Sequence, residues 1–324
     1  MNILFAGSPE FAVPSFERVA QTFPVVGALT APDAMKGRKK ALSPTPIASA
    51  AEARGIRVFK PDRLGRAARE EISAVNADLL VCVAYGRIFG PKFLGLFDHG
   101  GINLHPSLLP RHRGPAPIPA TILAGDKYAG ITIQKLALEM DAGDVLIQEQ
   151  RLLLGTETTG DLVNWAAERG AELLVEALSR IKDGSAESVP QNHNEATYCG
   201  LIDSEDARID WNESAEVIQR KVRAYNPWPK AFAYLEETRI AILEAVVHSG
   251  ADVKEAAPAG SIVGVDSSDG ILVQTGVGVL GVRTLKPQTR RTMSWRDFVN
   301  GAGVLQGRQF RSVPPGTRQS AKAR

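Results

Sequence analysis

Leu79-Leu80-Val81-Cys82-Val83-Ala84 is apolar throughout, which is typical of a strand buried on both of its faces. Similar short strands are predicted around it at Ile3–Ala6, Val25–Thr30, Arg57–Phe59 and Ile102–His105. Amphipathic helical patterns separate the early strands, as at Phe11–Ala20 and Thr45–Ala53. This alternation predicts an α/β domain built on a doubly wound, mostly parallel sheet.

The second half of the chain has a different pattern. Strands at Ile131–Leu136 and Val145–Leu154 and a helix at Thr159–Ile181 come first. After a helix at Ser214–Arg223, short strands alternate with Gly, Asp and Ser turns at Ala231–Leu235, Arg239–Val247, Ser261–Val265, Gly270–Gln274 and Leu280–Leu285. Such spacing predicts a small, OB-like β-barrel. We therefore expect a first domain at 1–190, a linker at 191–206, a barrel domain at 207–312 and a basic tail at 313–324.

Size and composition fit two globular domains, since the chain has 324 residues, of which 44% are hydrophobic and 23% charged. No apolar run approaches the ~18 residues of a membrane span, and no signal peptide is recognisable. We therefore expect no membrane association. The two cysteines, Cys82 and Cys199, favour a reducing cytoplasm. No Cys/His cluster has zinc spacing, so no metal is expected.

Charge is distributed unevenly along the chain. From Arg283 to the end there are ten basic residues and one acid, Asp297, so this stretch carries +9 and the preceding residues carry −7 of the total of +2. A second basic stretch runs from Lys36 to Lys40. This asymmetry indicates a polyanionic partner, and the alternative is a solvated basic surface.

The turn after the first strand, Gly7-Ser8-Pro9-Glu10, lacks the G-x-G-x-x-G pattern, which disfavours a nicotinamide cofactor. The densest candidate site is instead Ile102-Asn103-Leu104-His105-Pro106-Ser107-Leu108-Leu109-Pro110-Arg111-His112-Arg113-Gly114. A strand would place Asn103 and His105 on one face at its carboxyl end, where open α/β sheets bind ligands. An amide and an imidazole together offer a hydrogen-bond donor and a proton-transfer group. The alternative is a structural histidine.

Two further segments are candidates for the same site. Met140-Asp141-Ala142-Gly143-Asp144 lies between two predicted strands, and a carboxylate arriving near His105 would orient its ring. Read without that neighbour it is a polar turn. Ala84-Tyr85-Gly86-Arg87-Ile88-Phe89 follows a buried strand, and its glycine would let the backbone approach a flat ligand. An ordinary strand-to-helix turn is equally compatible.

Together these motifs resemble a known family. Asn103-x-His105, Ser107-Leu108-Leu109-Pro110-x-x-x-Gly114 and Asp141-x-Gly143-Asp144 resemble the signature of the 10-formyltetrahydrofolate-dependent formyltransferases. Within that family the resemblance is to enzymes that formylate the methionine on initiator methionyl-tRNA. It extends over nearly the whole chain, through Phe5–Ala12, the loop 32–46, Ala207–Trp211 and Arg223–Pro229.

The resemblance implies a Rossmann-like formyltransferase domain and a tRNA-binding barrel. Asn103 would donate to the tetrahedral oxyanion, His105 would stabilise it or take the amine proton, and Asp141 would orient the ring. The co-substrate 10-formyltetrahydrofolate would be held by Tyr85, Gly86, Arg87, Ile88, Phe89, Ser107, Leu108, Leu109 and Pro110. The tRNA would be bound by Lys36, Arg38, Lys39, Lys40, Arg283, Lys286, Arg290 and Arg291. A cytoplasmic monomer is expected.

Two other functions compete with this interpretation. A smaller acceptor, glycinamide ribonucleotide or an amino-sugar nucleotide, would preserve the chemistry, but it gives the second domain no purpose. A non-enzymatic RNA-binding module fits the basic end and the barrel. It leaves the joint occurrence of Asn103, His105 and Asp141 unexplained.

Overall fold

The computed structural model describes residues 1–36, 41–250 and 257–314, and the chain divides into two compact units. Unit 1 comprises Met1–Thr121, Lys127–Leu153 and Asp161–Leu201, and unit 2 comprises Ile122–Asp126, Leu154–Gly160 and Ile202–Arg324. The chain therefore crosses between the units more than once. The domain limits expected from the sequence remain predictions.

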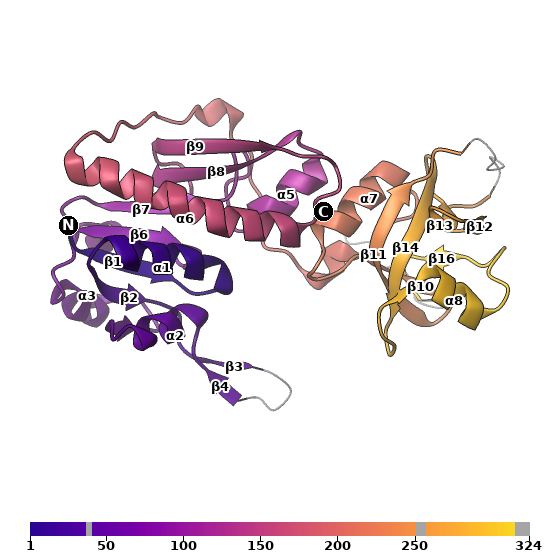
Figure 1. Cartoon of the computed structure of the whole chain (residues 1–324), viewed down its shortest axis with the longest axis horizontal. Helices are drawn as coiled ribbons and strands as arrows, with labels where there is room; N and C mark the ends of the chain where they lie inside the picture. The colour runs from indigo at the N-terminus through magenta and orange to yellow at the C-terminus, as the bar shows by residue number, and fades with distance from the viewer. Residues whose placement is uncertain (37–40, 251–256, 315–324) are drawn as a thin grey trace. The chain divides into compact units, whose positions relative to one another are not determined.

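Unit 1 is built on a seven-stranded sheet in the order β5-β2-β1-β6-β7-β8-β9 (Figure 1). The strands are β1 (Ile3–Gly7), β2 (Val25–Leu29), β5 (Val58–Phe59), β6 (Leu79–Val83), β7 (Gly101–His105), β8 (Tyr128–Lys135) and β9 (Val145–Leu152). The first five strands in that order pair in parallel, and β8 and β9 add in antiparallel fashion. The predicted doubly wound, mostly parallel sheet is confirmed.

Helices cover both faces of this sheet. They are α1 (Val13–Thr22), α2 (Pro46–Ala53), α3 (Arg66–Ser73), α4 (Pro91–Leu94), α5 (Pro117–Ala124) and α6 (Thr159–Asp183), with 3-10 turns η1 (Glu10–Ala12) and η2 (His193–Glu195). On one face, α6 approaches β7 closely, because a Cβ on Gly170 would lie 2.5 Å from the side chain of Leu104. Ile102 and Leu104 thus face α6, and alternation turns Asn103 and His105 to the other face.

Some short elements were not predicted from the sequence. Strands β3 (Ala34–Lys36) and β4 (Ala41–Ser43) pair with each other in an antiparallel arrangement. Thr45 caps α2, as its hydroxyl accepts a 3.1 Å hydrogen bond from the backbone N–H of Ala48. The basic residues Arg38, Lys39 and Lys40, between β3 and β4 in the sequence, lie outside the described residues.

Unit 2 is a curled antiparallel sheet in the order β12-β13-β14-β11-β10-β16, with β15 paired to β14 (Figure 1). Its strands are β10 (Phe232–Leu235), β11 (Thr238–Val247), β12 (Ile262–Asp266), β13 (Gly270–Gln274), β14 (Val279–Pro287), β15 (Met293–Ser294) and β16 (Phe310–Arg311), accompanied by η3 (Ser204–Ala207), α7 (Ala215–Ala224) and α8 (Trp295–Ala302). A bridge between Ser261 and Gln309 joins the two edges of the sheet. This closure makes the sheet a small barrel, as predicted.

Candidate active site

Polar side chains line one face of the sheet where β7, β8 and β9 run side by side. Asn103 lies opposite Gln134, and His105 lies opposite Thr132, which in turn pairs with Gln148 of β9. Directly opposed residues of antiparallel strands point to the same face. The first four side chains are almost fully enclosed, with exposed fractions between 0% and 9%. A sheet face this polar and this buried is an expected place for ligand chemistry.

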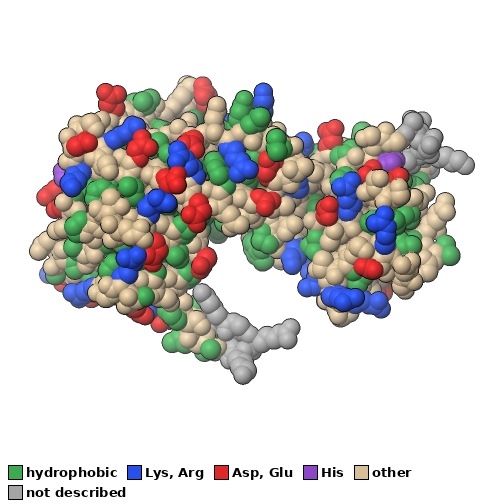
Figure 2. Space-filling view, viewed as in Figure 1, with side chains coloured by type: hydrophobic (Ala, Val, Ile, Leu, Met, Phe, Trp, Pro, Cys, Tyr) green, Lys and Arg blue, Asp and Glu red, His purple; other side chains and the backbone are tan. Residues whose placement is uncertain are grey.

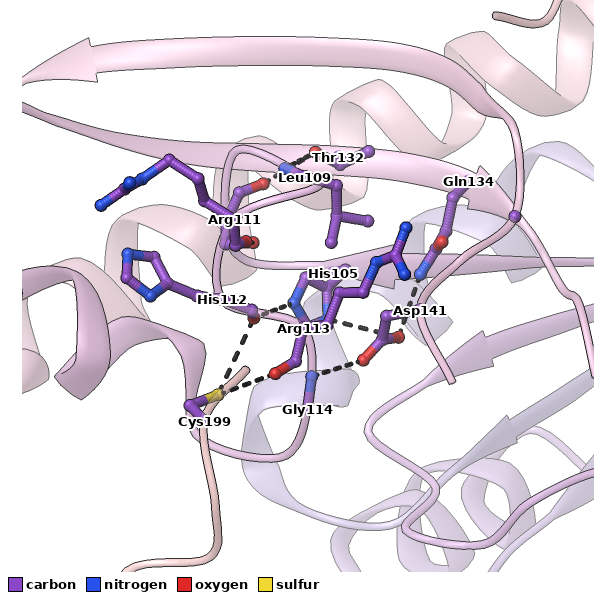
Figure 3. A network of polar contacts seen from close by, with 12 residues as sticks. His105, Leu109, Arg111, His112, Arg113, Gly114, Thr132, Gln134, Asp141 and Cys199 are labelled. Atoms are coloured by element: carbon purple, nitrogen blue, oxygen red, sulfur yellow. Dashed lines mark hydrogen bonds and ion pairs between the residues drawn. The ribbon is translucent and has the colours of Figure 1, made fainter. Parts of the chain in front are cut away.

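The His105 ring is held between two acceptors (Figure 3). Its Nε2 lies 2.9 Å from the backbone oxygen of His112, and its Nδ1 lies 3.5 Å from Oδ1 of Asp141. Because a carbonyl oxygen only accepts, Nε2 carries a proton, and Nδ1 then faces the carboxylate. Burial lowers the pKa of His105 below its ordinary value, while the Asp141 carboxylate and the His112 carbonyl act in the opposite direction. A proton taken up at Nδ1 would therefore face a negative charge.

Asp141 reaches this position from a tight turn between β8 and β9. Its φ is +54°, a left-handed conformation that costs a residue other than glycine about 1–3 kcal/mol. Its Oδ2 accepts a 2.8 Å bond from the N–H of Gly114, and its Oδ1 accepts a 3.0 Å bond from Nε2 of Gln134. Gly143 is required in the same turn, because a Cβ there would lie 1.9 Å from the backbone oxygen of Lys135.

The loop after β7 is pinned to β8 and β9 by hydrogen bonds. The hydroxyl of Thr132 donates to the Ser107 carbonyl at 2.7 Å and accepts from the N–H of Leu109 at 3.3 Å. Gln148 donates to the Leu109 carbonyl at 2.9 Å, and the hydroxyl of Ser107 donates to the Arg111 carbonyl at 2.6 Å. Hydrogen bonds therefore hold the segment Ser107–Pro110, which is predicted to bind folate, next to His105 in the chain.

The segment after β6 presents backbone rather than rings. The side chains of Tyr85 and Phe89 are buried in the core, where their rings stack with centroids 5.4 Å apart. Gly86 has a φ of +80°, and the side chain of Ile88 is 70% exposed. Since β6 and β7 are parallel neighbours, their carboxyl ends and the loops after them lie at the same sheet edge. The Arg87 guanidinium donates a 2.7 Å hydrogen bond to the carbonyl of Pro61, in the segment after β5.

The predicted tRNA-binding residues are widely spread. Lys36 is the last residue of β3, and Arg38, Lys39 and Lys40 are not described. In unit 2, Arg283 is ion-paired with Asp269 at 3.1 Å, and the remaining three, Lys286, Arg290 and Arg291, lie at or just beyond the end of β14. On the face shown in Figure 2, Lys and Arg side chains are interspersed with Asp and Glu side chains over both units. Their role in binding tRNA remains a prediction.

Sequence reasoning missed several residues that touch this site. Gln134 had a signal, because Thr132 and Gln134 alternate with buried isoleucines as Asn103 alternates with Leu104. Arg113 and Gln191 had no such signal, because they act on the site through their contact with each other, and they lie 78 residues apart in the chain. Gln191 also lies in the segment that we predicted to be a linker.

Residues of that segment, 191–206, also form hydrogen bonds with the loop after β7. The hydroxyl of Thr197 accepts a 2.8 Å bond from the N–H of His112, and the N–H of Cys199 donates to the Arg113 carbonyl at 2.8 Å. Cys199 is a free thiol, as is Cys82. Cys82 is 8% exposed and lies within the core cluster between the sheet and α4, so its thiol is packed in the core. Burial raises its pKa to about 12.

The described residues lack two features, a cluster of metal ligands and a membrane-spanning helix. No group of three or more His, Cys, Asp and Glu side chains in 1–36, 41–250 and 257–314 is arranged to hold a metal ion. Among the helices of those same ranges, none is long and apolar enough to cross a membrane.

Comparison with known proteins identifies the family. Residues 1–178 match the family model described as formyl transferase, and residues 201–303 match the one described as formyl transferase, C-terminal domain. The methionyl-tRNA formyltransferase of Treponema denticola is 42% identical over 312 residues, which cover 93% of this chain and 97% of that protein. That of Treponema pallidum is 44% identical and covers 94% and 98%. The chain belongs to the methionyl-tRNA formyltransferase family.

More distant members of this formyltransferase fold have solved structures. The sugar 3N-formyl transferase WlaRD, solved with dTDP and 5-N-formyl-THF, superposes with a TM-score of 0.64 at 14% identity, covering 90% of this chain and 99% of that one. HypX from Aquifex aeolicus in complex with tetrahydrofolic acid gives 0.60 at 17% identity, covering 94% of this chain and 48% of that one. At these identities the likeness concerns the fold.

Proposed function

We propose that this chain transfers the formyl group of 10-formyltetrahydrofolate to the α-amino group of methionine on initiator methionyl-tRNA. The product is N-formylmethionyl-tRNA for translation initiation. The observation that carries the proposal is the buried His105–Asp141 pair on the sheet face that also carries Asn103. Relatives named methionyl-tRNA formyltransferase align with more than nine-tenths of the chain.

The reaction needs three tasks from the protein. The methionyl amine attacks the formyl carbon on N10 of the folate and forms a tetrahedral intermediate with a negatively charged oxygen. The Asn103 amide donates to that oxygen, and such a bond strengthens as the charge develops. His105 takes the proton that the amine loses and gives it to N10 when the bond from N10 to the formyl carbon breaks. The nitrogen–carbon bond formed and the one broken thus balance.

Asp141 supports His105 during proton transfer. A neutral ring with its proton on Nε2 offers Nδ1 as the acceptor, 3.5 Å from Oδ1 of Asp141. Burial disfavours the imidazolium and has the largest effect on the pKa of His105, and the carboxylate offsets part of that effect by favouring the charged ring. The pair can therefore accept a proton although the ring is largely buried.

Two loops would hold the folate, and two basic regions would hold the tRNA. The backbone of Tyr85–Phe89 and the fixed segment Ser107–Pro110 end at the same sheet edge as His105. The structures of WlaRD and HypX, solved with folates, support a folate co-substrate. For tRNA we infer that Lys36–Lys40 guides the acceptor end and that the basic stretch from Arg283 holds the tRNA body. Protein of this kind would act as a monomer in the cytoplasm, where its product is used.

One experiment tests the proposal and its nearest alternatives together. Purified protein is incubated with 10-formyltetrahydrofolate and, in parallel, with charged initiator tRNA, free methionine, glycinamide ribonucleotide or an amino-sugar nucleotide. We expect formylation of the charged tRNA alone. Formylation of a small acceptor at a comparable rate would replace the proposed substrate, and no transfer to any acceptor would remove the enzymatic proposal.

A further inference from the structure

The turn that carries Asp141 is held from outside itself. A residue other than glycine keeps a φ of +54° only where its surroundings impose it. The carboxylate of Asp141 is bonded by Gly114 and Gln134, but those bonds hold the side chain. Its backbone needs a separate anchor, and Gln191 provides one.

The amide of Gln191 binds the turn at two points. Its Nε2 donates to the backbone oxygen of Asp141 at 2.8 Å and to that of Gly143 at 2.7 Å. An amide nitrogen has two hydrogens, and these two bonds are its shorter ones, since Oε1 of Gln134 lies farther away, at 3.3 Å. Gln191 is only 7% exposed, so water offers little competition for the bonds. One of the two carbonyls belongs to Asp141 itself and the other to Gly143 in the same turn, so both bonds hold the backbone that carries the carboxylate.

Arg113 fixes which way the Gln191 amide points. Its Nε and Nη2 lie 3.2 Å and 2.8 Å from Oε1 of Gln191. A guanidinium only donates, so Oε1 must face Arg113 and Nε2 must face the turn. The orientation of the amide is thus set by chemistry, without the ambiguity that usually attends a glutamine side chain.

Arg113 is itself completely enclosed, with an exposed fraction of 0%. Its Nη1 donates to Oε1 of Glu139 at 3.2 Å and to the hydroxyl of Tyr198 at 3.1 Å, and its Nη2 lies 3.3 Å from Nδ1 of His193. With the two contacts to Gln191, each of the five N–H groups of the guanidinium has an acceptor. Glu139 belongs to the same turn as Asp141, so Arg113 grips that turn directly as well as through Gln191.

We propose that Gln191, oriented by Arg113, is a positioning residue that sets where the Asp141 carboxylate stands relative to His105. This inference rests on the proposed function and adds to it a residue that acts through Asp141 without touching substrate. The separation of Nδ1 and Oδ1, 3.5 Å, leaves the pair sensitive to small movements of the turn. A misplacement of about 1 Å at such a group can cost about 10²-fold in rate.

Two substitutions of Gln191 separate positioning from packing. Gln191→Met keeps the length of the side chain but removes both donors. Gln191→Glu keeps the contact with Arg113, yet a carboxylate cannot donate to the carbonyls of Asp141 and Gly143. The matched control is Gln21→Met, a change at an exposed position in α1. Each protein is assayed for kcat and KM with charged initiator tRNA, and folding is checked by thermal denaturation.

We expect both Gln191 variants to fold and to lose at least about tenfold in kcat, with KM for folate and tRNA within about threefold of wild type. In Gln191→Met, NMR titration should also give a lower pKa for His105, because the ring loses part of the Asp141 charge. Its other titratable neighbour, His112, is retained. Gln191→Glu is left out of the titration because its own charge acts on His105.

Either of two results would overturn the inference: a Gln191→Glu enzyme with wild-type kcat, or a Gln191→Met protein with an unshifted His105 pKa. The titration does not require activity. If the wild-type protein fails to formylate tRNA, the proposed function falls, while the titration still decides whether Gln191 positions Asp141.

Discussion

Replacing Gly143 with alanine should push the Asp141 turn away from His105. A Cβ at residue 143 would lie 1.9 Å from the backbone oxygen of Lys135, whereas ordinary van der Waals contact begins at 3.4 Å. The obstacle is backbone, so the turn or β8 must move by about 1.5 Å. Since a misplacement of about 1 Å can cost about 10²-fold, we expect kcat to fall by about 10²-fold. Overpacking of this kind should also lower the free energy of unfolding by about 1–3 kcal/mol.

The assay is steady-state formyl transfer to charged initiator tRNA, run below the melting temperature of the variant. Gly200→Ala is the matched control, because an added Cβ there has no heavy atom within 4 Å and the residue has no positive φ. It should keep wild-type kcat and stability. A folded Gly143→Ala enzyme with kcat within about threefold of wild type would refute the claim that the position of this turn limits the rate.

Three further variants test the proposed roles. Asn103→Ala should lower kcat by about 10²–10³-fold with little change in folate affinity, measured by equilibrium binding beside the kinetics. Asp141→Asn should lower activity and shift the pKa of His105 downward, because the carboxylate favours the charged ring; an unchanged pKa in an NMR titration would assign Asp141 to the substrate instead. Arg290→Ala combined with Arg291→Ala should weaken tRNA binding and reduce the slope of log affinity against log salt by about one to two, and an unchanged slope would make these residues ordinary solvated surface.

The strongly patterned parts of the fold were predictable from the sequence. The strands β1, β2 and β6 are continuous apolar runs that favour a buried strand, and α6 follows a clear helical periodicity. The helices α3 and α8 were missed for a physical reason. Arg66–Ser73 is mostly polar, so its few buried residues give a weak pattern, and Trp295–Ala302 lies in a stretch that we treated chiefly as basic surface.

The candidate site divides in the same way. Asn103 and His105 could be placed together because residues two positions apart in a strand share a face. Asp141 was assigned to the same site because of its motif, Asp141-x-Gly143-Asp144. The contacts of Arg113 with Gln191 could not be predicted, because they join residues 78 positions apart through hydrogen bonds that leave no local pattern. Buried polar residues outside regular elements are found only when their partners are seen.

The central claim is that His105 moves a proton during formyl transfer to tRNA-bound methionine. The most direct measurement is the single-turnover rate of formyl transfer for wild type and His105→Gln, with folate and charged initiator tRNA saturating. Glutamine retains hydrogen-bonding groups but does not titrate. We predict a rate at least about 10²-fold lower in the variant, with dissociation constants for both ligands within about threefold. A His105→Gln enzyme that transfers formyl groups at close to the wild-type rate would contradict the account.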